Sequence, residues 1–175
     1  MHKYHNNQLE YAIAGRPRLS REYIQERLRE CEQKDDHRRR LKRLLHAYIE
    51  MQPPRPQVVA DIAADLVALE LGIDMPAVGR MNENEMQDDP NKLGYAPTRN
   101  ENLIIIRMDV CACTIARTVA HETRHRWQID TGRFLDMLGK GTSEPDAEQF
   151  ASEFVRKHLV GHRCPCGTII YPKMN

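Results

Sequence analysis

The sequence predicts an α+β fold in which a charged helical arm precedes a compact domain of helices and a few strands. Several segments carry apolar residues at i, i+3 and i+4, the spacing of a buried helical face. Two short segments, Met75–Met81 and Leu103–Ile106, are predicted strands, the second because it is apolar and β-branched. The proline cluster Pro53–Pro56 breaks the chain and predicts a boundary between an arm, residues 1–52, and a domain, residues 57–175.

Composition limits the class of protein. The 175 residues carry a formal net charge of +1, which gives no bulk electrostatic sign of a nucleic-acid-binding protein. No apolar run approaches the ~20 residues of a membrane span, and the N-terminus lacks the apolar core of a signal peptide. We therefore expect a cytoplasmic protein without membrane attachment. Five cysteines, an odd number, favour reduced thiols or a metal site over disulfides.

The arm is predicted to be helical and heavily charged. Arg21–Cys31 and Arg38–Met51 form two helices, or one helix with a weak point near residues 35–36. A basic cluster at residues 38–43 has acidic residues interleaved nearby, so we interpret it as a solvated face rather than a nucleic-acid contact. The arm is also a candidate for binding a protein partner. The second half carries a helical apolar stripe of Leu41, Leu44, Leu45, Tyr48 and Ile49.

The domain begins with a predicted amphipathic helix, Gln57–Leu71, which Gly72 ends. The stretch Asn82–Pro90 between the two predicted strands is polar and carries no predicted element. Further along, Ile115–Asp130 contains neither Gly nor Pro and is predicted as a helix that stops at Thr131 and Gly132. The buried side of the first helix is supplied by Val58, Val59, Ile62, Leu66, Val67 and Leu69.

The helix Ile115–Asp130 contains the pattern H-E-x-x-H at residues 121–125. Residues four apart share a face of a helix, so His121 and His125 can direct two imidazoles at one metal ion. Glu122 lies beside them, where it reaches a metal-bound water more easily than the metal itself. This arrangement is typical of a zinc hydrolase with a glutamate base. The alternative is a solvated face with two ordinary histidines, and the small, apolar residues before the pattern weigh against it.

A catalytic zinc usually has three protein ligands and one open position, so a third ligand is needed. After a short apolar turn, Phe134–Leu138, and a Gly-rich loop, a second helix is predicted to start at Glu144. Ser143 is the predicted N-cap, and Pro145 is tolerated in the first turn. Glu144 is in register with the inward face of this helix, and an inward carboxylate needs a partner such as zinc. That face consists of Ala147, Phe150, Ala151, Phe154 and Val155.

H-E-x-x-H followed by E-x-x-A-x-x-F-A resembles the ImmA/IrrE-type metallopeptidases, within the wider group of zincins whose third ligand is a glutamate. The resemblance extends weakly upstream to about Gln57 and does not cover the arm. It implies a minimal, gluzincin-like zincin fold with a small sheet beside the H-E-x-x-H helix. In such zincins an edge strand binds the substrate chain in extended form. The matching residues are His121, Glu122, His125, Glu144, Ala147, Phe150 and Ala151.

These residues predict a zinc-dependent peptidase, and the resemblance implies that its substrate is a specific protein such as a regulator. His121, His125 and Glu144 hold one catalytic Zn²⁺. Glu122 acts as the general base that takes the proton of the attacking water and passes it to the leaving amine. Glu148, where the family usually has Asn or Asp, is placed to accept the N–H of a ligand histidine.

Other residues compete for roles at this site. Asp136, Asp146 and Glu148 are the alternatives to Glu144 as third ligand, although Asp146 better suits the N3 capping position facing Ser143. A second donor to the oxyanion is expected, for which Tyr171 and His162 are candidates.

Two C-x-C pairs flank the predicted site in the sequence. One lies just before the H-E-x-x-H helix and the other in the C-terminal tail, so together they can form a second, structural zinc site. Four reduced thiols are the alternative. Cys31 is expected to pack within the arm, and His158 and His162 are interpreted as surface residues or as supports of the ligands. The two pairs are Cys111 and Cys113, and Cys164 and Cys166.

Two further functions fit the same pattern. One is a non-catalytic zinc-binding regulatory or interaction protein of the same fold, although a metal scaffold alone does not need the acid at Glu122. The other is a protease acting on DNA-bound proteins, as SprT-like zincins do. That protein would need a nucleic-acid surface, for which residues 38–43 are the sole candidate.

Overall fold

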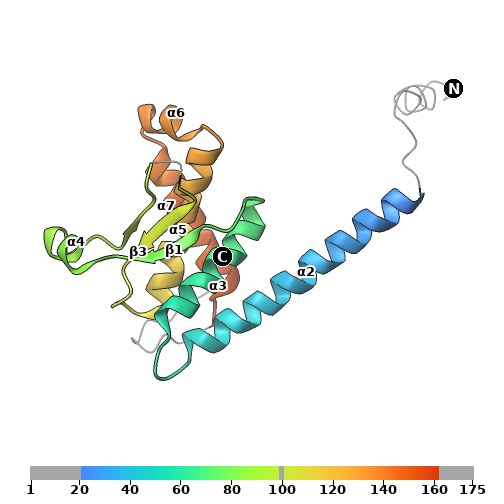
Figure 1. Ribbon diagram of the computed structural model, residues 1–175, viewed down its shortest axis with the longest axis horizontal. Coiled ribbons are helices and arrows are strands. Elements are labelled where there is room, and N and C mark those ends of the chain that lie inside the picture. The colour runs from blue at the N-terminus through green and yellow to red at the C-terminus, as the bar shows by residue number, and fades with distance from the viewer. Residues whose placement is uncertain (1–20, 99–100, 162–175) are drawn as a thin grey trace, which may run out of the picture. The chain divides into compact units, whose positions relative to one another are not determined.

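The computed structural model describes residues 21–98 and 101–161 and, in agreement with the predicted class, is α+β and mostly helical (Figure 1). The chain divides into two compact units between Asp36 and His37. No helix in this part of the chain is long and apolar enough to cross a membrane. The helices are α2 (Arg21–Ile49), α3 (Pro56–Leu71), α4 (Glu83–Asp88), α5 (Ala112–Asp130), α6 (Phe134–Gly139) and α7 (Ser143–His158), and the strands are β1 (Ala77–Arg80), β2 (Gly94–Tyr95) and β3 (Leu103–Ile106).

Helix α2 is continuous, so the arm forms one helix rather than two. In the first unit the described side chains of α2 are exposed, Cys31 among them, so the expected packing of Cys31 is wrong. In the second unit Leu41, Leu45 and Ile49 repeat every four residues and are buried in the core. The packed unit therefore begins before the proline break, which separates α2 from α3.

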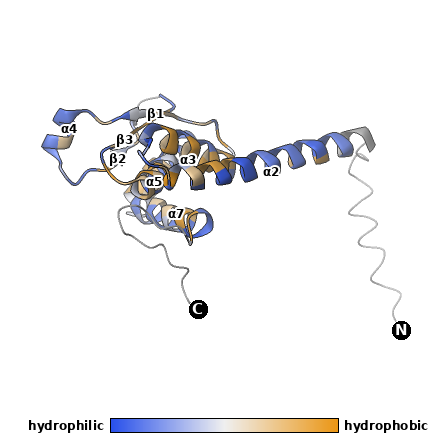
Figure 2. Cartoon of the chain, turned by 90° about the horizontal axis from the view of Figure 1, so that it is seen from below, coloured by the Kyte–Doolittle hydropathy of each residue, from blue (hydrophilic) through white to orange (hydrophobic). Residues whose placement is uncertain are grey.

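Helix α3 is the apolar centre of the second unit, and many of its residues have the orange colour of hydrophobic residues in Figure 2. Pro56 occupies its first turn, where a missing N–H costs nothing, and Gly72 ends it with φ 67° while its N–H bonds the carbonyl of Ala68. The helix packs against α5 and β1, and α5 packs in turn against α7 and β3. Its buried residues are Val59, Ala60, Ile62, Ala63, Ala64, Leu66, Val67 and Ala68.

The three described strands form one sheet in the order β1-β3-β2, with β1 parallel and β2 antiparallel to β3. The register pairs Ala77 with Leu103 and Gly94 with Ile106. The second and fourth residues of β3 are fully buried, as period-two alternation requires. The prediction of β3 is confirmed, the first strand is shorter than predicted, and β2 was not predicted. Because β2 pairs with β3 alone among the described strands, it is an edge strand.

A short helix, α4, lies within the polar stretch that was given no element. Its N-terminus is a capping box, in which the Asn82 side chain accepts from the Glu85 N–H and the Glu85 carboxylate accepts from the Asn82 N–H, both at 2.9 Å. Tyr95 donates its hydroxyl hydrogen to Glu85 at 2.5 Å and so ties α4 to β2. The N-x-x-E pattern of a capping box was present in the sequence and could have located this helix.

The start of α7 differs from prediction in its capping. Thr142, not Ser143, is the N-cap, and its side chain makes no capping hydrogen bond. Asp146 does not cap the helix either, since its carboxylate pairs with the guanidinium of Arg124 from α5. The start of α7 is therefore held by hydrogen bonds from α5 rather than by a capping side chain of its own.

The end of α7 is held to α3 by a partly buried ionic cluster. His158 is 3% exposed, so its interpretation as a surface residue is wrong. Its Nε2 lies 2.7 Å from a carboxylate oxygen of Glu70, and Lys157 reaches the same oxygen at 2.5 Å. Burial opposes the ionisation of Glu70, but the hydrogen bonds from His158 and Lys157 outweigh it and lower the pKa of Glu70 to about 2.

Candidate metal centre

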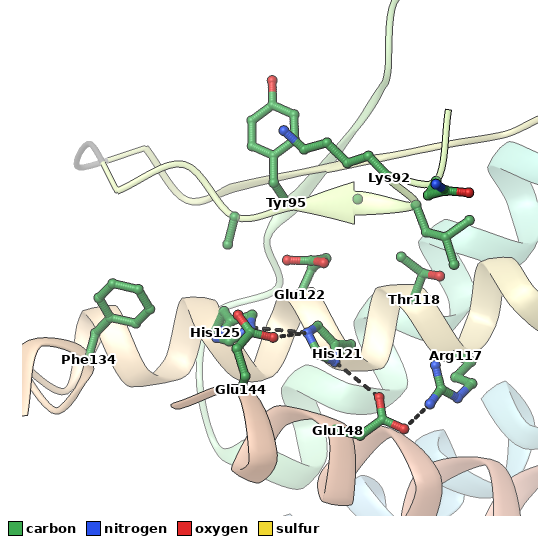
Figure 3. A pocket seen from close by; sticks show the side chains of 14 residues that line it. Lys92, Tyr95, Arg117, Thr118, His121, Glu122, His125, Phe134, Glu144 and Glu148 are labelled. Carbon is green, nitrogen blue, oxygen red and sulfur yellow. Dashed lines mark hydrogen bonds and ion pairs between the residues drawn. The ribbon is translucent and has the colours of Figure 1, made fainter. Parts of the chain in front are cut away.

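Three side chains from two helices converge at the predicted site (Figure 3). The Nε2 atoms of His121 and His125 on α5 lie 3.1 Å apart. The two carboxylate oxygens of Glu144 on α7 lie 3.3 Å from His121 Nε2 and 3.1 Å from His125 Nε2. One imidazole nitrogen from each histidine and a carboxylate oxygen therefore surround one point, and the group could hold a metal ion.

The separations between these atoms are compatible with one metal ion bound between the three side chains. Bonds of about 2.0–2.1 Å at tetrahedral angles place any two ligand atoms about 3.3–3.4 Å apart. The separation of the two Nε2 atoms, 3.1 Å, lies close to that edge length. Each carboxylate oxygen of Glu144 lies at a similar distance from one of these nitrogens, 3.3 Å for His121 and 3.1 Å for His125. The donor set of two imidazoles and one carboxylate is also one that catalytic zinc sites use.

The protonation of His121 suits a ligand, because a metal binds the neutral imidazole. Burial, together with the neighbouring His125, lowers the pKa of His121, while Glu144 and Glu148 act to raise it. The ring is therefore neutral near pH 7, with a lone pair available on one nitrogen.

Glu144 sits differently from what its sequence register suggests. Its side chain is 73% exposed, so the expectation of an inward-facing carboxylate is wrong. It lies in the first turn of α7 with its carboxylate over the two histidines at the open side of the site (Figure 3). Its carboxylate oxygens contact the two imidazoles. The position of Glu144 therefore depends on the contacts that hold the first turn of α7 in place.

Glu148 lies one turn later, on the His121 side of the site. Its carboxylate oxygen is 3.7 Å from His121 Nδ1, which is too long for a hydrogen bond. The carboxylate forms an ion pair with Arg117 of α5. Glu148 is thus near the atom that it was predicted to hold, and the contact between them is electrostatic.

Glu122 lies on the side of α5 that faces β2 (Figure 3). Its side chain is buried, which raises its pKa to about 8, and the charge of Glu144 acts in the same direction. Lys92 and a hydrogen bond from the backbone of Ala96 oppose this rise. A buried acid with a raised pKa beside a candidate metal centre is a typical feature of a functional site.

An open pocket of about 410 Å³ lies over these residues. One wall is the edge strand β2 with its flanks, and the other is formed by α5, α6 and α7. At one end Phe134 stands edge-on to His125 with ring centroids 6.1 Å apart. The lining residues are Asn91, Lys92, Leu93, Gly94, Tyr95, Ala96, Arg117, Thr118, His121, Glu122, His125, Phe134, Glu144 and Glu148.

Gly94 lets β2 approach α5 closely. A Cβ atom at this position would lie 2.9 Å from the carbonyl oxygen of Ile105, 2.9 Å from Thr118 Cγ2 and 3.0 Å from Glu122 Cγ. All three separations are shorter than normal van der Waals contact. Only glycine therefore fits between the sheet and the side chains of Thr118 and Glu122 on α5.

The remaining predicted residues do not join the site within the described part of the chain. Asp136 pairs with Lys140 on α6 and is exposed. The Sγ atoms of Cys111 and Cys113 lie 3.2 Å apart at the start of α5, with Cys111 as the N-cap residue. The other residues assigned to the tail lie outside the described residues, namely Cys164, Cys166, His162 and Tyr171.

Sequence reasoning missed Gln128, which is fully buried on α5 one turn after His125. It also missed the β2 residues Gly94 and Tyr95, because a two-residue strand leaves no periodic pattern. Gln128 had a usable signal, since a polar residue at i+3 from a ligand histidine shares its face of the helix.

Comparisons of the chain with protein-family models, with curated proteins and with solved structures found no match.

Proposed function

We propose that this protein is a zinc-dependent peptidase of the zincin type that cleaves a specific protein substrate. The observation that carries the proposal is the convergence of His121, His125 and Glu144 at separations of 3.1–3.3 Å with the buried acid Glu122 beside them. A structural metal site has no use for that acid, whereas hydrolysis requires a base at this place.

His121, His125 and Glu144 would hold the zinc ion. When bound, zinc acts as a Lewis acid that polarises a peptide carbonyl and lowers the pKa of a coordinated water towards ~7. Glu122 takes the proton of the attacking water and delivers it to the nitrogen of the leaving amine. Burial raises the pKa of Glu122 to about 8, nearer neutrality than that of an ordinary carboxyl, which suits a group that both takes and delivers a proton.

The substrate chain would lie along β2. This strand uses one edge to pair with β3, and its residues Gly94 and Tyr95 line the pocket above Glu122. A peptide added to the free edge in extended form would make main-chain hydrogen bonds that are independent of its sequence, and the pocket would select its side chains. Phe134 provides an apolar wall at one end of the pocket, and Lys92 and Arg117 provide cations elsewhere in it.

The test is Glu122→Gln in the full chain. The amide keeps the size of the side chain and all three ligands, so the variant should bind zinc as the parent does. Cleavage should fall by at least the ~10²–10⁴-fold that general base catalysis contributes. The matched control is Glu153→Gln, the same change on the exposed surface of α7, where Glu153 pairs with Gln149.

The assay uses zinc-loaded protein and a proteome-derived library of proteins and peptides, with new N-termini identified by mass spectrometry. Sites cut by the parent and by Glu153→Gln but not by Glu122→Gln support the proposal. Equal cleavage by Glu122→Gln refutes the mechanism. Zinc binding without any cleavage by the parent would favour the non-catalytic zinc-binding protein instead.

A further inference from the structure

A fully buried amide, Gln128, contacts both helices of the candidate metal centre. Its Oε1 lies 2.9 Å from Nδ1 of His125 on the same helix. Its Nε2 lies 2.8 Å from a carboxylate oxygen of Asp146 and 3.1 Å from the carbonyl oxygen of Ser143, both on α7. Gln128 is 0% exposed, so each of these contacts replaces a hydrogen bond to water.

The two contacts to α7 fix the orientation of the amide. An NH₂ group has two hydrogens to donate, and a carbonyl oxygen and a carboxylate oxygen can only accept them. Turning the Gln128 amide over would place its oxygen against both acceptors. Oε1 therefore faces His125, and His125 must carry its proton on Nδ1 to donate to it.

The tautomer of His125 follows from this arrangement. A neutral imidazole with its proton on Nδ1 has its lone pair on Nε2, and Nε2 is the atom directed at His121 and Glu144. Without an acceptor at Nδ1, the ring could hold its proton on Nε2 and would then be unable to bind a metal there.

Asp146 is itself held in place by Arg124. The guanidinium makes two parallel hydrogen bonds to the carboxylate, 2.6 Å from Nε and 3.0 Å from the terminal nitrogen. It also stacks over the Trp127 ring, 3.9 Å from the centroid, and lies 5.3 Å from the Phe150 ring centroid. A forked pair on an aromatic surface leaves the carboxylate little freedom to turn away from Gln128.

The same contacts hold the third ligand. Glu144 lies between Ser143 and Asp146, and both are bonded to α5, one through its backbone carbonyl and the other through its carboxylate. The side chain of Glu144 is mostly exposed and Thr142 caps α7 without a side-chain bond, so local contacts do little to place it.

We propose that Gln128, anchored by Asp146 and Arg124, is a positioning residue that sets the tautomer of His125 and holds the first turn of α7 in register with α5. One hydrogen-bonded chain thereby presents ligands from two helices to the same ion. The inference deepens the proposed zinc site and rests on His125 being a ligand. Its first test, however, needs no metal.

The first experiment measures the tautomer of His125 by ¹⁵N NMR in the full chain after metal has been removed with a chelator. The parent should show His125 with its proton on Nδ1. Gln128→Met, which keeps the shape and removes both polar groups, should shift it towards the Nε2-protonated form. Gln149→Met is the matched control, because it makes the same change on the exposed surface of α7.

The second experiment measures Zn²⁺ affinity of the same proteins by competition with a chromophoric chelator. Loss of a group that orients a ligand typically lowers metal affinity ~10–100-fold, and we expect this of Gln128→Met but not of Gln149→Met. If Gln128→Met does not fold, Asp146→Ala takes its place, because Asp146 is partly exposed and its loss removes the nearer of the two acceptors that orient the Gln128 amide.

The outcomes are separable from those of the proposed function. An Nδ1-protonated His125 that is unchanged in Gln128→Met, or in Asp146→Ala, overturns the inference whatever the protein cleaves. A shifted tautomer with unchanged Zn²⁺ affinity overturns it too, since positioning would then have no consequence for the site. A parent that binds Zn²⁺ but cleaves nothing refutes the peptidase and leaves the positioning role standing.

Discussion

Replacing Gly94 with alanine tests the close approach of β2 to the site helix. The added Cβ would lie 2.9 Å from the Ile105 carbonyl oxygen, 2.9 Å from Thr118 Cγ2 and 3.0 Å from Glu122 Cγ. Carbon atoms in contact normally lie about 3.5–4.0 Å apart, so β2 and α5 would have to separate by roughly 0.5–1 Å. The backbone oxygen cannot rotate away, and Thr118 and Glu122 are both buried.

Inserting a methyl group into a packed site typically costs ~1–3 kcal/mol. With three close contacts, we expect Gly94→Ala to lower the free energy of unfolding by about 2 kcal/mol. The proposed metal ligands lie on α5 and α7 and not on β2, so Zn²⁺ affinity should change by less than about twofold. Cleavage should fall much more, because a displaced β2 moves the substrate relative to Glu122.

Chemical denaturation of Gly94→Ala, Thr118→Ser and the double variant provides the assay. Thr118→Ser removes only Cγ2 and so relieves one of the three contacts. The double variant should therefore be more stable than the sum of the single changes predicts, by about 1 kcal/mol. Additive effects, or a Gly94→Ala protein as stable as the parent, would refute the packing argument.

Three further predictions concern the ligands, a buried ion pair and the tail. In a zinc competition titration, Glu144→Ala should lose far more affinity than Glu148→Ala, whose loss should be ~10-fold; the reverse order would make Glu148 the ligand. Glu70→Gln should lower stability by about 2 kcal/mol near pH 6. Because the Glu70 pKa is depressed to about 2, this difference in denaturation should persist above its unfolded pKa of 4.5 and vanish as the pH falls towards 2. Replacing Cys164 and Cys166 with Ser should lower the zinc count from elemental analysis by one, and an unchanged count would leave plain thiols.

The features that the sequence predicted are those with a local periodic signal. Helix α3 carries a continuous apolar face with Pro56 at its start and Gly72 at its end, and the structure confirms it. Strand β3 is an apolar run that ends in three β-branched isoleucines, and it was predicted to the residue. The two histidines face one point because their spacing of four is a property of any α-helix.

The features that were missed depend on contacts between distant segments. Strand β2 exists because β3 pairs with it and because Gly94 fits against α5, and neither fact is visible in the polar sequence around it. His158 was interpreted as a surface residue or a support of the ligands because its partner, Glu70, is 88 residues away. Burial of a charged residue cannot be inferred from sequence unless its partner is known.

Glu144 and Gln128 show, within a single site, what the sequence can predict and what depends on contacts between distant segments. The register of α7 identified the glutamate correctly as a neighbour of the two histidines but gave it a buried side chain, whereas it is 73% exposed. An exposed carboxylate can occupy one place only if its backbone is held, and the holding bonds come from Gln128 and Arg124, 15 and 22 residues from their partners. Spacing along a helix can thus predict which side chains meet at a metal centre. The contacts that hold these side chains in place are buried polar contacts between helices, which only the folded chain reveals.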